Sequence, residues 1–147
     1  MKTLRIYLSI AAVLFAFSAC AQKAEVFATK KGAIDGYDPV AYFKQHKAVK
    51  GNHTYSEQWN GATWYFSSKE NLDAFTQDPE KYAPQFGGYC AYAVANGYTA
   101  KSEGDAWKIV EGKLYLNYNL KVKEQWQEKQ TEYIKSARQN WPKVLKK

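Results

Sequence analysis

Cys90 is the residue of this chain best suited to chemistry, because a thiolate can act as a nucleophile, a redox centre or a metal ligand. The only other cysteine is Cys20, which lies where we expect an export signal to be cleaved. The exported protein would then hold one cysteine available for side-chain chemistry and no internal disulfide. Two glycines precede Cys90 and a short apolar run follows it, which predicts a loop leading into a helix. The N-terminus of a helix stabilises a thiolate, so a lowered pKa at Cys90 is one interpretation.

A metal site is the first hypothesis for Cys90. Beyond the expected signal the chain has two histidines, His46 and His53, and no methionine. Copper(I) prefers thiolate, thioether and imidazole ligands, so a site for copper or another transition metal would use Cys90, with His53 as a second ligand. No Cys-x-x-Cys or His-x-x-x-His spacing supports such a site. We expect His46 to be solvent-exposed and Asp38 to cap a helix more than to bind a metal.

Two other interpretations of Cys90 stay open. A thiol redox protein would use Cys90 alone, with backbone N–H groups of the preceding glycine loop stabilising an oxidised sulfur or binding an anion. A non-catalytic interaction domain would keep Cys90 as a buried, inert core residue, and Tyr89, Tyr92 and Tyr98 near the loop could then line a small pocket. No nucleotide-binding, hydrolase or metalloprotease motif is present, so no catalytic residue is predicted and enzyme activity is the less favoured interpretation; cofactor-binding residues stay unidentified.

The N-terminal residues 1–21 are typical of an export signal peptide. Lys2 and Arg5 precede a short apolar run that is too short to span a bilayer. Cleavage after Ala21 fits the small-x-small rule, whereas a lipobox-like reading makes Cys20 the lipidated N-terminus. We therefore expect a protein in the periplasm, or one anchored by lipid at a membrane facing the periplasm. Cys20 would be its only contact with the membrane surface.

The composition of residues 22–147 fits one domain with a hydrophobic core. The chain is mildly basic, with a formal net charge of +7, but its lysines are spread out. Nucleic-acid binding requires a dense basic stripe, and none is present. A single cysteine excludes a disulfide scaffold, so the aromatic residues, which make up 16% of the chain, must supply the core.

Two β-hairpins are predicted, with strands at residues 55–59 and 63–66 and at residues 107–110 and 113–117. Asn60-Gly61 and Glu111-Gly112 supply their two-residue turns. We expect the hairpins to pair into one small antiparallel sheet packed with several helices, an α+β fold.

Helices are predicted wherever a capping residue precedes a suitable run. Asp38-Pro39 starts one that ends before residue 51, Ser67 opens a capping box, and Asp78-Pro79 starts a short turn. Asn119 caps a long C-terminal helix that Pro142 ends or kinks. One face of this helix carries Trp126, Tyr133, Ala137 and Trp141 at helical spacing.

In six segments the chain resembles YHS-domain proteins, and in particular their exported single-domain branch. The shared segments are DPVAYF (38–43), NGATWYFSS (60–68), FTQDPEKY (75–82), GGYC (87–90), WKIVEGKLYLN (107–117) and NWP (140–142). The resemblance implies a small α+β domain and, by association with metal transporters, the handling of heavy metals.

The chain departs from the metal-binding relatives at the positions of their presumed ligands. Those relatives carry cysteines where this chain has Ala41 and Ser67, and a third where it has Asn71 or Leu72. The metal ligands implied by the resemblance are therefore missing, and any metal site would have to be built around Cys90.

Overall fold

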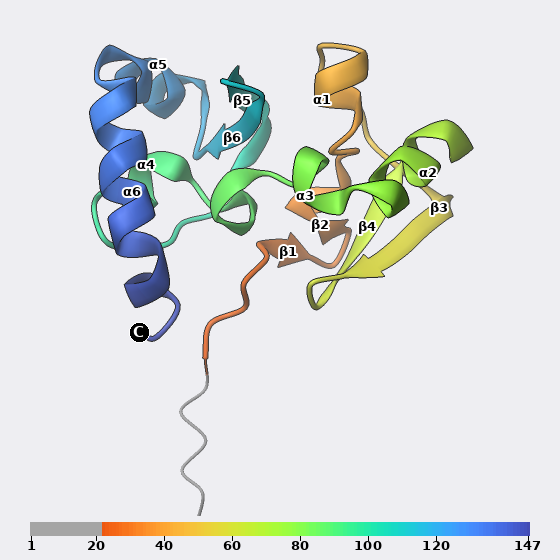
Figure 1. The fold of residues 1–147 in the computed structure, drawn as a ribbon, viewed down its shortest axis with the longest axis horizontal. Coiled ribbons are helices and arrows are strands. Elements are labelled where there is room, and N and C mark those ends of the chain that lie inside the picture. The colour runs from red at the N-terminus through yellow and green to blue at the C-terminus, as the bar shows by residue number, and fades with distance from the viewer. Residues whose placement is uncertain (1–21) are drawn as a thin grey trace, which may run out of the picture.

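The computed structural model describes residues 22–147. The expected signal peptide, with Cys20 and both predicted cleavage points, lies outside the described residues. Within residues 22–147 there are six α-helices, two short 3-10 helices and three separate two-stranded antiparallel sheets (Figure 1). In chain order they are β1 (Ala28–Thr29), β2 (Gly32–Ala33), η1 (Ile34–Gly36), α1 (Ala41–Lys44), β3 (Asn52–Trp59), β4 (Ala62–Phe66), α2 (Lys69–Gln77), α3 (Pro79–Tyr82), η2 (Gln85–Gly88), α4 (Ala91–Ala95), β5 (Glu103–Val110), β6 (Lys113–Asn117), α5 (Leu120–Glu128) and α6 (Gln130–Val144).

The predicted α+β class and both predicted hairpins are confirmed. Asn60 and Gly61 have φ of 49° and 76°, as the turn between β3 and β4 requires. Glu111 and Gly112 do the same between β5 and β6, with φ of 51° and 72°. The prediction that the hairpins share one sheet is wrong, because each remains a sheet of its own. The hairpins meet through side chains of β6 that pack against the first hairpin, so no edge-to-edge pairing is needed.

Two hydrophobic clusters form the interior, and we call them the first core and the second core. The first core joins the N-terminal sheet, α1, the first hairpin, α2 and α3, with Trp64, Phe66 and Phe75 at its centre. The second core joins η2, α4, α5 and α6 around Trp126 and Ala137. In Figure 1 they correspond to the two lobes on either side of the β5–β6 hairpin.

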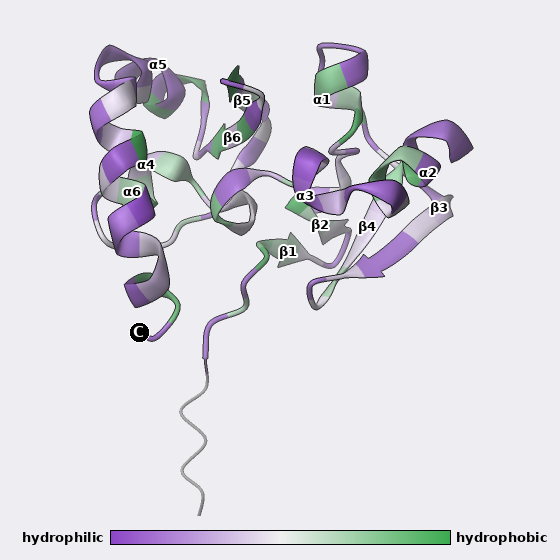
Figure 2. Cartoon of the chain, viewed as in Figure 1, coloured by the Kyte–Doolittle hydropathy of each residue, from purple (hydrophilic) through white to green (hydrophobic). Residues whose placement is uncertain are grey.

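Strand β6 belongs to both cores. Successive side chains of a strand point to opposite faces, and here Leu114 and Leu116 enter the first core while Tyr115 enters the second. Asn117 is buried as well. Figure 2 shows the consequence, since β6 carries strongly hydrophobic residues whereas β3, at the outside of the first hairpin, is mostly hydrophilic. Tyr42 adds a further link, because its hydroxyl donates to the Gly104 carbonyl oxygen at 2.9 Å.

Helix α1 ends before residue 51, as predicted; it spans four residues, and the chain leaves it through His46, whose φ is 52°. Two other helix predictions need correction. Ser68, one residue later than predicted, caps α2 by accepting from the Asn71 N–H at 3.1 Å. The long C-terminal helix is two helices, because Lys129 has φ of −132° and interrupts the pattern. Pro142 lies inside α6 and does not end it.

The two glycines before Cys90 allow the N-terminal leader to pass close by. Gly87 has φ of 61°, and a Cβ there would lie 1.7 Å from the Glu25 carbonyl oxygen. A Cβ on Gly88 would meet Ile34. The Phe27 N–H donates to the Gly87 carbonyl oxygen at 2.9 Å, which ties the leader to η2. The glycines therefore allow a close approach of two backbone segments.

No helix within residues 22–147 is both long and apolar enough to cross a membrane.

Candidate functional site

Cys90 lies at the start of α4, as predicted, but it is buried with only 1% of its surface exposed. Its thiol faces Asn117, with 3.7 Å between Sγ and Oδ1. The same Asn117 oxygen accepts the Tyr92 N–H at 3.1 Å, so β6 supplies the cap that α4 does not receive from its own N-cap residue. The backbone N–H of Cys90 is used as well, because it donates to the Ala100 carbonyl oxygen at 3.0 Å.

The electrostatic surroundings keep Cys90 a thiol. Burial raises the pKa of Cys90, and this effect outweighs the neighbouring backbone N–H groups of Ala93, Tyr118 and Tyr92, which lower it. The expected lowering of the pKa by the helix N-terminus is therefore wrong, since removal from water is the larger effect. A protonated, enclosed thiol is a poor nucleophile and a poor metal ligand.

The tyrosines near this loop do not assemble a pocket around Cys90. Tyr89 is buried and donates its hydroxyl to the Ala24 carbonyl oxygen at 2.9 Å. Tyr92 packs edge-on against Tyr133, with 5.1 Å between the ring centroids. Tyr98 is 52% exposed. Two of the three rings are thus used in packing.

His53 lies in a different environment from Cys90. It is an exposed residue of β3 and stacks on Tyr65, with 4.4 Å between ring centroids. His46 is exposed beyond α1, as predicted. Among residues 22–147, no group of three or more His, Cys, Asp and Glu side chains is placed to hold a metal ion. Within these residues the predicted metal site at Cys90 and His53 therefore gains no further ligand. It stays a prediction that titration with metal ions can test.

Asp38 is the best-connected polar side chain of the first core. It is completely buried, and its Oδ1 accepts the N–H groups of Val40 at 2.8 Å and Ala41 at 3.2 Å. Its Oδ2 accepts the Ser67 N–H at 2.8 Å, the Ser67 hydroxyl at 2.7 Å and the Asn71 amide at 2.8 Å. The predicted capping role is confirmed, and the carboxylate also joins the start of α1 to the start of α2. We call these residues the Asp38 network.

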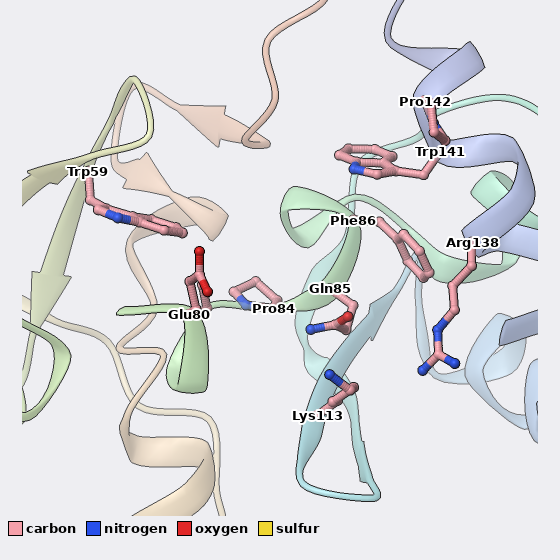
Figure 3. A pocket seen from close by; sticks show the side chains of 10 residues that line it. Trp59, Glu80, Pro84, Gln85, Phe86, Lys113, Arg138, Trp141 and Pro142 are labelled. Carbon is pink, nitrogen blue, oxygen red and sulfur yellow. The ribbon is translucent and has the colours of Figure 1, made fainter. Parts of the chain in front are cut away.

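A cleft of about 420 Å³ lies at the junction of the two cores. Figure 3 shows Trp59 on one side and Trp141 with Phe86 on the other, with Pro84 between them. Its remaining lining residues are Glu80, Ala83, Gln85, Lys113, Arg138 and Pro142. A smaller hollow of about 100 Å³ adjoins the cleft, because both are lined by Trp59, Ala83, Pro84 and Trp141.

Each tryptophan of the cleft is held by its own core. Trp59 packs edge-on against Phe75, with ring centroids 5.6 Å apart, and its carbonyl oxygen accepts the Trp64 indole N–H at 3.0 Å. Trp141 packs edge-on against Phe86 at 5.8 Å. Both tryptophans are only partly buried. Each ring is thus fixed on one side and presents its remaining surface to the cleft.

The family model of the YHS domain matches residues 40–86. The chain contains a YHS domain. No curated protein and no solved structure matches the chain. The matched residues run from the start of α1 into η2, so Cys90 and all of the buried second core except Phe86 lie beyond the YHS match.

YHS domains are suggested to bind metal, but the residues of this one do not fit a metal ion at the family's positions. Ala41, Ser67 and Asn71, which is one of the two candidates for the third position, do gather in space, because all three bond to Asp38. Ala41 has no donor side chain, and Ser67 and Asn71 point their polar groups at the carboxylate. The Asp38 network therefore takes the place of a ligand set, with its oxygens already satisfied by protein donors.

The cleft spans the edge of the YHS match. Trp59, Glu80 and Phe86 lie within the matched residues, whereas Lys113, Arg138 and Trp141 come from the rest of the chain. Sequence reasoning missed this site, although it singled out Trp141 as part of a packed helix face. The separation of Trp59 from Trp141 along the chain explains the omission, because only the tertiary fold brings them together.

Proposed function

We propose that this protein is an exported, non-catalytic binding protein whose ligand site is the cleft between the YHS domain and the second core. Cys90 is a structural residue in this proposal. The single observation that carries it is the cleft itself, with two tryptophans held on opposite sides and charged side chains beside them. Binding sites for small molecules favour such junctions between packed units, and they combine aromatic walls with a few polar groups.

The competing functions have less support in the geometry. A redox thiol needs access to its partner and a stable thiolate, and Cys90 is enclosed with a raised pKa. A copper or zinc site needs several ligands in one place, and residues 22–147 offer no such group. The cleft needs neither chemistry, because binding there depends on shape, stacking and charge.

The indole N–H signals in a nuclear magnetic resonance spectrum provide the test. The chain has five tryptophans, so these signals are few and can be assigned with Trp59→Phe and Trp141→Phe. We expect a mixture of two-ring aromatic compounds of positive, zero and negative charge to shift the signals of Trp59 and Trp141. The signal of Trp126, buried in the second core, is the internal control. Shifts confined to other residues, or no shifts, would contradict the proposal.

Export is a separate part of the proposal and rests on residues 1–21. Cell fractionation of the full-length chain tests it, and accumulation in the cytoplasm would contradict it. Cys20→Ser then separates the two cleavage interpretations. If the protein is a lipoprotein, Cys20→Ser should release it from the membrane fraction. If it is cleaved after Ala21, its distribution between the cell fractions should not change.

A further inference from the structure

We infer that the cleft selects an aromatic small molecule that carries a negative charge, with the anionic group against the wall formed by the second core. This inference rests on the proposed function, because it names the class of ligand for the same cleft. It follows from the distribution of aromatic and charged side chains over the two walls.

The aromatic side chains define the body of the ligand. Trp59 from the β3–β4 hairpin and Trp141 from α6 stand on opposite sides of the cleft, and Phe86 lies below Trp141 in Figure 3. These rings are fixed by their own packing, so little side-chain entropy is lost when a flat ligand stacks on them. The volume of about 420 Å³ lies in the range of small-molecule sites. A two-ring compound is therefore a suitable probe.

The charged side chains define the ligand's polar group. Lys113 at the start of β6 and Arg138 of α6 lie on the second-core side, whereas Glu80 of α3 lies on the side of Trp59 (Figure 3). Within residues 22–147 neither Lys113 nor Arg138 belongs to an ion pair. Glu80 thus stands across the cleft from Lys113 and Arg138, and the basic wall is free to receive an anion.

Arg138 is oriented before any ligand arrives. Its Nη2 donates to the Tyr115 hydroxyl at 3.3 Å, and Tyr115 is itself buried in the second core. One bond to a fixed partner leaves other guanidinium N–H groups available, and a guanidinium can bind a carboxylate through two of them. Lys113 provides a second positive charge on the same wall. A carboxylate at this wall would be attracted by both.

A set of three ligands with the same ring tests the inference. The probes are 2-naphthylacetate, its neutral amide and 2-(2-naphthyl)ethylamine, titrated while the Trp59 and Trp141 indole signals are followed. We expect the acetate to bind roughly tenfold more tightly than the amine, because charge-assisted hydrogen bonds replace repulsion. Binding of the acetate should weaken as salt is added, since the charged groups are exposed.

Three exposed positions provide matched variants. Within residues 22–147 the side chains of Lys113 and Glu80 make no hydrogen bond to either core, and Arg138→Gln removes only the bond to the Tyr115 hydroxyl. Arg138→Gln and Lys113→Gln should each weaken binding of the acetate about threefold to tenfold and leave the amide unchanged. Glu80→Gln should strengthen binding of the acetate and weaken binding of the amine. These variants remain informative even if substitution of either tryptophan unfolds the protein.

The possible outcomes separate the inference from the proposed function. Equal affinity for all three probes, with shifts at Trp59 and Trp141, would overturn the inference and leave the cleft as a binding site. No shifts with any probe would overturn both. A preference for the amine that disappears in Glu80→Gln would reverse the sign of the inferred charge.

Discussion

Removing the carboxylate of Asp38 should destabilise the protein more than any other substitution of a single acidic residue. Asp38 is fully buried and accepts from two side-chain groups and three backbone N–H groups. In Asp38→Ala the Asn71 amide can still reach the Ser67 hydroxyl, since the two already lie 3.3 Å apart. The N–H groups of Val40, Ala41 and Ser67 have no such alternative.

The size of the effect follows from these three N–H groups. A buried donor left without a partner costs about 1–3 kcal/mol, so leaving three of them unpaired should lower the free energy of unfolding by at least about 3 kcal/mol. Asp38→Asn keeps the shape and one acceptor oxygen for Val40 and Ala41. Its amide would however face the donors of Ser67 and Asn71, so we expect a loss of about 2–3 kcal/mol.

Denaturation in urea, followed by tryptophan fluorescence and circular dichroism, measures these differences. Asp73→Ala is the matched control, because Asp73 is an exposed residue of α2 that pairs only with Lys69, and we expect its midpoint to stay unchanged. A free energy of unfolding for Asp38→Ala within about 1 kcal/mol of the wild type would refute the reasoning. It would mean that Asp38 does not join α1 to α2 as described.

Three further predictions concern Cys90, the metal hypothesis and the close approach at Gly87. Burial raises the pKa of Cys90 above its ordinary value of 9.0, so the contribution of the buried thiol to stability should be complete below pH 9.0 and lost as pH rises toward the folded pKa. In urea denaturation series, the difference in free energy of unfolding between wild type and Cys90→Ala should therefore narrow from pH 7.5 to pH 10. A constant difference would contradict this prediction. Titration with copper(I) and zinc under reducing conditions should reveal no stoichiometric site that Cys90→Ser or His53→Ala removes, whereas such a site would restore the metal hypothesis. Gly87→Ala should lower the free energy of unfolding by at least about 2 kcal/mol, because the new Cβ would meet the Glu25 carbonyl oxygen. The control Gly112→Ala, where a Cβ would have no atom within 4 Å, should lower it by only about 1 kcal/mol through backbone strain. Equal losses of stability in the two variants would show that the contact with Glu25 is unimportant.

Local signals allowed much of the secondary structure to be predicted. The turns at Asn60 and Glu111 and the caps at Asp78 and Asn119 depend on residues a few positions apart, and the structure contains all of them. The α2 cap was misplaced by one residue for a reason that local sequence does not contain. Ser67 was the predicted cap, but its hydroxyl is bound by Asp38, which lies 29 positions earlier.

The candidate site was less predictable because its parts are distant in sequence. The sequence left open whether Cys90 is buried or reactive, because the side chain that faces its thiol, Asn117 of β6, lies 27 positions later. The residues around Asp38 were identified as positions of missing metal ligands and, at Ser67, as a helix cap. Their mutual hydrogen bonds became evident once the fold brought positions 41, 67 and 71 together. Predicting the cleft would have required the relative positions of the two cores, which the sequence alone does not give.

Because β6 belongs to both cores, it limits how early the chain can fold during synthesis. The first core is drawn mostly from residues before Pro84, but it is closed by Leu114 and Leu116. During synthesis the N-terminal part of the chain appears first, so its apolar side chains must wait for these later leucines. We expect the YHS segment to remain incomplete until β6 is available. A chain that stopped before β6 would then expose apolar surface to chaperones and proteases.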